Sequence, residues 1–201
     1  MSTGLVVVPI VEGHGEVEAV PELLRRLVPA VDPAVQAQVL APLRVQKGKL
    51  LKVDELERHV DLAARKAGEK GAVLVLLDAD DDCAAELGPQ LLARAARSRP
   101  DALVSVVLAV REFETWFLAA AQSLQGRRGL SHDLAPPDYP ESIAGAKEWL
   151  RQRARAQRYR PTIDQAALAA TFDLVAARAA SPSFDKMWRE VARLVREAGS
   201  S

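Results

Sequence analysis

The sequence has little of what several common protein classes require. Cys83 is the only cysteine among 201 residues, so no internal disulfide can form, which suits a reducing compartment. Aromatic residues make up 4% of the chain, too few to indicate a surface on which nucleic-acid bases stack. No basic segment followed by a long apolar run opens the chain, and the run Val6–Val8 is too short to cross a bilayer. We therefore expect a cytoplasmic protein that does not span a membrane.

The formal net charge is zero, yet the two signs are unevenly distributed. Residues 1–146 carry 16 Lys and Arg against 21 Asp and Glu, whereas residues 147–201 carry 11 against 6. The segment from Lys147 to Arg160 holds six basic residues and one acidic residue. This distribution is typical of a metal site beside an anion-binding surface, although a solvated basic helix face would have the same composition.

Hydrophobic residues make up 49% of the chain, enough for a sizeable core. Apolar runs alternate with helical patterns up to about residue 120, which predicts parallel strands joined by helices. Beyond a loop at 126–140 only helical patterns follow. We expect an α/β fold, a mainly parallel sheet flanked by helices with an all-helical C-terminal third: a core at 1–125 and a helical extension at 126–201 packed on it. The expected strands are 5–11, 39–45, 72–77 and 103–110, and the expected helices are 16–28, 54–69, 84–97, 141–157, 164–180 and 184–198.

Acidic residues follow three of these expected strands. The carboxyl ends of parallel strands meet at one edge of a sheet, where α/β proteins bind their ligands. The three groups are Glu12 with Glu16 after residues 5–11, Asp78 with Asp80 after residues 72–77, and Glu112 with Glu114 after residues 103–110.

Carboxylates that converge at one point repel each other, and burying them without a cation costs several kcal/mol or more. Mg²⁺ and Mn²⁺ prefer oxygen ligands, and one or two such ions would balance the charge. The pattern therefore predicts a divalent-metal site that works on phosphate chemistry. We expect only one of Glu112 and Glu114 to face this site.

The Asp-rich segment 78–82 also has other interpretations. A calcium EF-hand loop starting at Asp78 would need Gly at its sixth position and Glu at its twelfth, and this chain has neither. A phosphatase of the haloacid-dehalogenase type carries its Asp pair after the first strand, whereas this pair follows a later one. Asp81 or Asp82 would cap the next helix, whose N-terminus favours negative charge. Asp78 and Asp80 then remain for the metal.

The order of these motifs resembles the Toprim domain, the catalytic core of topoisomerases, primases and OLD-family nucleases. The segment VEGHGE at 11–16 looks like the Val-Glu-Gly-x-x-Glu form of OLD-type Toprims, and LLDAD at 76–80 looks like the second Toprim motif. REFETWFL at 111–118 and SPSF at 181–184 are similar to segments of small stand-alone bacterial Toprim-like proteins of unassigned function. The resemblance touches most of the chain and implies a Toprim-like sheet.

The resemblance also implies a role for each matching residue. One or two Mg²⁺ or Mn²⁺ ions would activate water and stabilise the leaving oxygen. OLD-type nucleases use a lysine after the sheet, and Lys147 is the best-placed candidate. They also carry an ATPase portion, which is either absent here or supplied by a separate partner. The implied metal ligands are Glu12, Glu16, Asp78, Asp80, Glu112 and Glu114, with Glu12 and Lys147 as catalytic residues.

Three functions remain open. The first is Mg²⁺- or Mn²⁺-dependent hydrolysis of nucleic-acid phosphodiesters, as by a defence or mobile-element effector. The second is a metal-dependent phosphatase or nucleotide hydrolase, and the third is a non-catalytic binding subunit with a vestigial acidic site. Neither Tyr139 nor Tyr159 lies in a motif, which argues against strand passage through a covalent tyrosyl link. In the nuclease, basic side chains would contact backbone phosphates without sequence preference. These are Arg151, Arg153, Arg155, Arg158 and Arg160.

Overall fold

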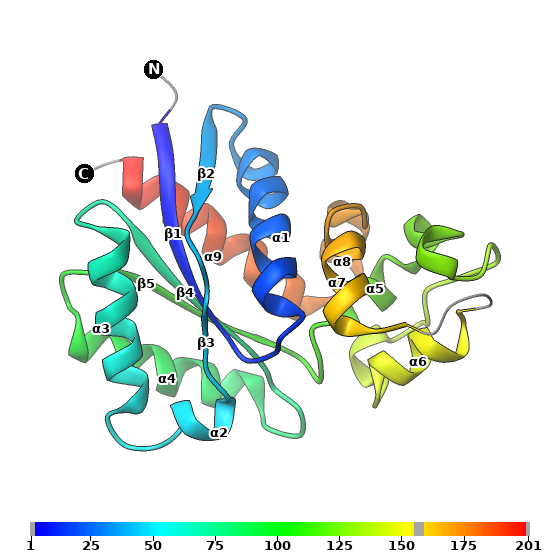
Figure 1. The fold of residues 1–201 in the computed structure, drawn as a ribbon, viewed down its shortest axis with the longest axis horizontal. Helices are drawn as coiled ribbons and strands as arrows, with labels where there is room; N and C mark the ends of the chain where they lie inside the picture. Colours follow the sequence, from blue (N-terminus) through cyan, green and yellow to red (C-terminus); the bar gives the residue numbers. More distant parts are fainter. Residues whose placement is uncertain (1–2, 155–158, 200–201) are drawn as a thin grey trace.

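The computed structural model describes residues 3–154 and 159–199 of the chain. Its strands form one sheet in the order β2-β1-β4-β5, and β3 pairs with β1 beyond the end of β2 (Figure 1). Each of these pairings is parallel, so the carboxyl ends of the strands meet at one edge of the sheet. The strands are β1 (Thr3–Val11), β2 (Val35–Val39), β3 (Leu43–Arg44), β4 (Ala72–Asp78) and β5 (Leu103–Ala109).

Helices cover both faces of this sheet (Figure 1). On one face lie α1 (Glu16–Val31) and α9 (Pro182–Gly199), and on the other lie α3 (Glu55–Ala67) and α4 (Ala84–Ser98). Buried apolar side chains form one core cluster on each face. The predicted α/β fold, with a mainly parallel sheet flanked by helices, is confirmed.

The two central strands explain the unbroken apolar runs in the sequence. All seven residues of β4 are buried, because α1 and α9 cover one face of the sheet while α3 and α4 cover the other. Successive β4 residues alternate between the two core clusters: Leu74 and Leu76 belong to one, Val73 and Val75 to the other. A strand covered on both faces needs apolar residues at every position rather than at alternate ones.

The predicted strand at 39–45 is wrong in its bounds, because this part of the chain forms two short strands, β2 and β3. Backbone hydrogen bonds join Val7 and Val11 of β1 to the segments on either side of the interruption. Pro9 lies between these two positions and faces the interruption. Neither Pro9 nor Pro42 has an N–H group, so neither can donate a ladder hydrogen bond there.

The last third of the chain is helical, as predicted, but the helices expected at 141–157 and 164–180 differ in their bounds, whereas the one expected at 184–198 is slightly longer, as α9. The helix expected at 141–157 begins only at α6 (Ala146–Gln152), after Gly145, whose φ of 75° is not helical. Its expected end includes residues 155–158, which lie outside the described residues. None of the described helices is long and apolar enough to cross a membrane.

The single helix expected at 164–180 is two helices, α7 (Pro161–Ala169) and α8 (Leu174–Ala180). The side chain of Asp173 accepts hydrogen bonds from the backbone N–H groups of Val175 (2.8 Å) and Ala176 (3.0 Å). Asp173 therefore caps a new helix where the periodic pattern suggested a continuous one.

Aromatic side chains join the helical extension to the α/β core. Phe113, Trp116 and Phe117, at and just before α5 (Thr115–Ala119), are fully buried. Trp116 contacts Phe184 and Phe117 contacts Phe172, both from the extension, with ring centroids 5.2 and 5.4 Å apart. Hydrophobic side chains before and after residue 125 thus share one core cluster, which fixes the extension beside the carboxyl ends of the strands (Figure 1).

Candidate functional site

A cleft of about 360 Å³ lies at the carboxyl ends of β1 and β4. Acidic side chains from both strand ends line it, together with Lys147 from α6 and the first residues of α7. The parallel sheet and the extension packed beside it thus bring together segments far apart in the sequence. The predicted site residues that line the cleft are Glu12, Glu16, Asp78, Asp80 and Lys147.

Lys147 lies at the centre of the acidic residues. Its ammonium is 3.4 Å from Asp78 Oδ2, 3.3 Å from Glu112 Oε1 and 3.3 Å from Glu114 Oε2. The backbone N–H of Lys147 also donates to Glu112 Oε2 at 2.9 Å, so Glu112 holds both ends of this residue. Of the basic residues between 147 and 160 that the structure describes, Lys147 pairs with the strand-end carboxylates.

Glu112 and Glu114 both pair with Lys147. Neither lines the cleft, so the expectation that only one of them faces the site stays a prediction. The chain does not continue as a strand after β5: Arg111 has a φ of 63°, and Glu114 is the N-cap residue of α5. This turn directs both carboxylates to the same side. Glu114 is fully buried, and its Oε2 pairs with Lys147 without hydrogen-bond geometry.

Burial raises the pKa of several carboxyl groups in the cluster. It raises the pKa of Asp78 well above its usual value, and the charge of Glu16 raises it further. The pKa of Glu114 is also raised by burial, although the Lys147 charge opposes the shift. Burial alone would lower the pKa of Lys147, but Glu114, Asp78 and Glu112 raise it more. The site therefore holds more buried carboxyl groups than Lys147 can balance.

Glu16 is attached to the loop that follows β1. Its Oε2 accepts hydrogen bonds from the backbone N–H groups of Glu12 (3.1 Å) and Gly13 (3.2 Å). A Cβ on Gly13 would lie 2.8 Å from Glu16 Oε1, so glycine leaves the space that this carboxylate occupies. Burial raises the pKa of Glu16 to about 7, and Glu114 adds to the rise. The Oε2 of Glu12 is buried and has no hydrogen-bond partner among the described residues.

Lys47 holds the second acidic motif, and the sequence did not reveal it. It begins the short helix α2 (Lys47–Leu50), and its ammonium donates to the carbonyls of Asp78 and Ala79, both at 3.0 Å. It also pairs with the carboxylate of Asp80, whose φ of 53° turns the chain out of β4. Burial lowers the pKa of Lys47, but its bonds to Asp80 and Asp82 outweigh burial and raise it. Lys49 lies two positions further along the chain, so no local sequence pattern distinguishes Lys47 from it.

The expectation that Asp81 or Asp82 caps α4 is wrong. Cys83 occupies the N-cap position, and no side chain there makes a capping hydrogen bond. Asp82 Oδ2 instead lies 3.3 Å from the Lys47 ammonium, and Asp81 pairs with Arg111. These two aspartates hold the loop after β4 between α2 and the turn after β5.

Tyr159 contacts the site, although it lies outside every sequence motif. Its hydroxyl donates to Glu114 Oε1 at 2.9 Å, and its side chain is 2% exposed. Burial and the adjacent Glu114 charge raise its pKa well above the usual value. A buried, protonated phenol that already donates to a carboxylate is not available as a nucleophile, which agrees with the argument against a tyrosyl link.

The arginines expected to bind phosphate have different surroundings. Arg151 donates to the carbonyl of Tyr159 at 3.3 Å, and Arg160 is exposed at the N-cap of α7. The guanidinium of Arg153 stacks 3.9 Å over the ring of Trp149. Arg155 and Arg158 lie outside the described residues.

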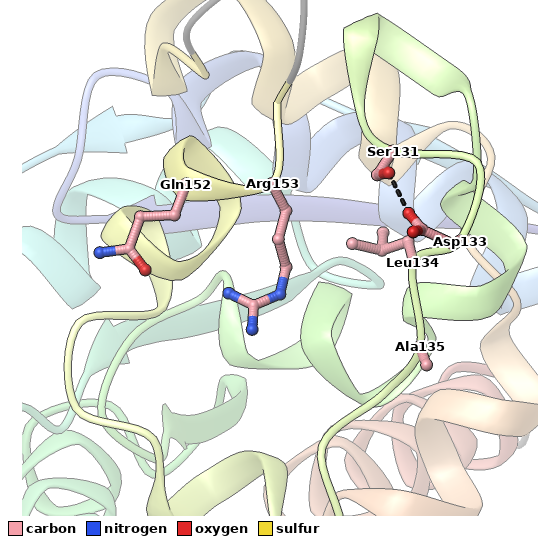
Figure 2. A pocket seen from close by; sticks show the side chains of 6 residues that line it. All are labelled: Ser131, Asp133, Leu134, Ala135, Gln152 and Arg153. Carbon is pink, nitrogen blue, oxygen red and sulfur yellow. Dashed lines mark hydrogen bonds between the residues drawn. The ribbon is translucent and has the colours of Figure 1, made fainter.

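Another cavity, of about 610 Å³, lies beside Arg153 rather than at the carboxylates. Figure 2 shows Arg153 across from the segment Ser131–Ala135, where the Ser131 hydroxyl is bonded to Asp133. None of the strand-end carboxylates lines this cavity. We therefore place the candidate site in the smaller cleft, where the titratable groups with shifted pKa values converge.

In the part of the chain that the structure describes, no three His, Cys, Asp or Glu side chains are grouped so that they could hold a metal ion. Asp78, Glu112 and Glu114 instead pair with Lys147, and Asp80 pairs with Lys47. The donor chemistry nevertheless fits a hard cation, because all the candidate ligands are oxygens and Glu12 Oε2 has no hydrogen-bond partner among the described residues.

Comparison with known proteins gives one assignment. No curated protein and no solved structure matches the chain. A family model described as a domain of unknown function, DUF4276, matches residues 11–192, which include every acidic residue of the site and Lys147. The chain therefore belongs to the DUF4276 family.

Proposed function

We propose that the cleft is the active site of a Mg²⁺- or Mn²⁺-dependent hydrolase that cleaves phosphodiester bonds in nucleic acid. One observation carries this proposal: Lys147 pairs with acidic side chains that follow β4 and β5, and it lines one cleft with the acidic side chains that follow β1 and β4. The motif order that resembles Toprim nucleases supports it independently. Buried carboxyl groups in excess of their cations are what a divalent ion stabilises.

The metal would be held by the oxygens of Glu12, Asp78 and the Glu112/Glu114 pair, with Asp80 and Glu16 as further donors. Once bound, a divalent ion lowers the pKa of its water and offsets the charge of a phosphate. Asp78 is already fixed, since its Oδ1 accepts the Phe113 backbone N–H at 2.7 Å. The raised pKa values of Asp78 and Glu114 imply that ion binding releases protons from these groups.

Lys147 would stabilise negative charge that develops on the phosphate. Its side chain is 30% exposed and lines the cleft, whereas Glu114 is fully buried. A cation held among carboxylates keeps its proton, since its pKa is raised. Glu12 is the candidate general acid or base, because it lines the cleft and one of its oxygens has no partner among the described residues.

The test is cleavage of supercoiled plasmid, linear DNA, single-stranded DNA and RNA by the purified chain with Mn²⁺, Mg²⁺ or EDTA. Asp78→Asn and Glu12→Gln should each lower the rate by about 100-fold or more. Asp101→Asn is the matched control, because Asp101 precedes β5 and lies at the opposite edge of the sheet. Unchanged cleavage by Asp78→Asn would contradict the proposal. Activity of the chain alone would also show that no ATPase partner is required.

Two alternatives make different predictions. A cleft of about 360 Å³ would also accommodate a nucleotide, so a phosphatase or nucleotide hydrolase would cleave small phosphate esters and leave nucleic acids intact. A non-catalytic binding subunit is favoured by the way Lys147 already neutralises part of the acidic cluster. That subunit would keep its biological activity after Asp78→Asn.

A further inference from the structure

One wall of the cleft carries no carboxylate. It is formed by Pro161, Thr162 and Gln165 from the first two turns of α7. Gln165 is 1% exposed, and its Nε2 has no hydrogen-bond partner among the described residues. A buried amide without a partner costs free energy on folding, so its retention at the edge of a cleft indicates a ligand.

The N-terminus of α7 adds a second favourable feature to this wall. The helix has nine residues and begins with Pro161, which lines the cleft and has no N–H group, and the N–H groups of Ile163 and Asp164 donate to the Arg160 carbonyl. The positive end of the helix dipole therefore lies at the cleft. Asp164, the acidic residue in its first turn, is already neutralised: its Oδ1 pairs with Arg128 at 2.8 Å, and its Oδ2 accepts the Arg160 N–H at 2.8 Å. This wall therefore favours an anion.

The loop after β1 holds this wall close to the acidic residues. A Cβ on Gly15 would lie 2.0 Å from Gln165 Oε1 and 2.7 Å from the carbonyl oxygen of Pro161. Only glycine leaves room for this contact, which packs the Glu12–Glu16 loop directly against the first turns of α7. The side-chain oxygen of Gln165 thus faces Gly15, while its NH₂ group remains to bind a ligand.

We propose that Gln165, together with the Thr162 hydroxyl, binds a non-bridging oxygen of the substrate phosphate. The proposal rests on the proposed function in taking this phosphate to be a nucleic-acid phosphodiester. The amide NH₂ group of Gln165 donates hydrogen bonds and cannot ligate a cation. The carboxylates opposite it repel an anion and cannot bind one directly. A phosphate bound to a divalent ion satisfies both walls at once. Gln165 is therefore a substrate-binding residue, with no role in proton transfer.

The test measures binding without cleavage. A fluorescent single-stranded oligonucleotide is titrated with full-length protein in Ca²⁺, followed by anisotropy, and inorganic phosphate is titrated by calorimetry. Gln165→Met removes the donor and keeps the side-chain volume; it should weaken oligonucleotide binding about tenfold or more. Gln165→Glu should weaken it further, because a carboxylate repels the phosphate. Gln90→Met is the matched control, since Gln90 is exposed on α4 on the other face of the sheet.

Thermal melting separates binding from folding. Gln165→Met should melt at the same temperature as the wild-type protein or higher, because it removes an unpartnered buried amide. In the cleavage assay it should raise KM and leave kcat largely unchanged. Oligonucleotide binding equal to the wild type would overturn the inference. A loss confined to inorganic phosphate would also overturn it, since the ligand would then be a free phosphate. Wild-type binding without cleavage would instead count against the proposed function alone.

Discussion

The ammonium of Lys147 lies 3.3 Å from the Oε2 of Glu114, a carboxylate that is fully buried. Glu114 is the N-cap residue of α5, shortly after β5, whereas Lys147 belongs to α6 in the helical extension. The extension therefore supplies the cation that balances the acids of the sheet. A role for Lys147 in stability follows, whatever its part in catalysis.

Lys147→Met should destabilise the metal-free protein by about 3 kcal/mol, because buried carboxyl groups lose their cation. Urea unfolding in EDTA measures this change. Lys66→Met on the exposed side of α3 is the control and should change stability by less than about 0.5 kcal/mol. A loss no larger than that of the control would show that Lys147 and the carboxylates are solvated rather than paired.

Mn²⁺ should stabilise the protein against heat. An ion that binds only the folded state, at about 100 times its Kd, contributes about 2.7 kcal/mol, which raises the melting temperature of a chain this size by ~5–10 °C. Asp78→Asn should lose most of this shift, and excess EDTA should reverse it. Asp101→Asn should keep the shift in full. An equal rise in both variants would place the bound ion elsewhere.

The metal-free protein should lose stability as the pH rises. The pKa of Glu16 is raised from its ordinary value of 4.5 to about 7, chiefly by burial, so the folded state favours the protonated carboxyl. The stability from this group is complete below about pH 4.5 and is lost as the pH rises through about 7. Urea midpoints between pH 4.5 and 8 should decline more steeply for the wild type than for Glu16→Gln. The Gln oxygen can still accept the N–H groups of Glu12 and Gly13, so the loop should remain in place.

Lys47→Met should destabilise the protein by about 2–3 kcal/mol. The ammonium donates to two buried carbonyls and pairs with Asp80, and hydrogen bonds that involve a charged group contribute about 1.5–3 kcal/mol. The same substitution should weaken Mn²⁺ binding, because the turn at Asp80 loses its anchor. Lys49→Met, two residues away on an exposed side chain, is the control. Equal unfolding midpoints for the two variants would count against this anchoring role.

Tyr159→Phe should cost about 1–3 kcal/mol, since Glu114 Oε1 loses the hydroxyl that donates to it. Nucleic-acid cleavage should persist, and no covalent protein–DNA adduct should form with either protein. Tyr139→Phe, at an exposed tyrosine, should leave stability unchanged. A covalent adduct that Tyr159→Phe abolishes would contradict the argument against a tyrosyl nucleophile.

Much of the fold follows from local sequence patterns. The unbroken apolar runs of β1, β4 and β5 identified buried parallel strands, because a strand covered on both faces needs apolar residues at every position. The predicted bounds of strands and helices were wrong where one or two residues determine them. Pro9 and Pro42 divide an expected strand, and Asp173 starts a helix inside an expected one. Periodicity does not register such single-residue effects.

The sequence by itself determined that acidic residues end three neighbouring strands, since parallel topology brings those ends to one edge. Only the tertiary structure decided which cationic side chains and hydrogen-bond donors contact these acidic residues. Lys47, Lys147, Tyr159 and Gln165 lie between 31 and 150 positions away from the carboxylates and the loop that they contact. No local pattern distinguishes these residues from their neighbours. Their places are set by how α2, α6 and α7 pack against the sheet, which depends on the hydrophobic core rather than on the residues themselves.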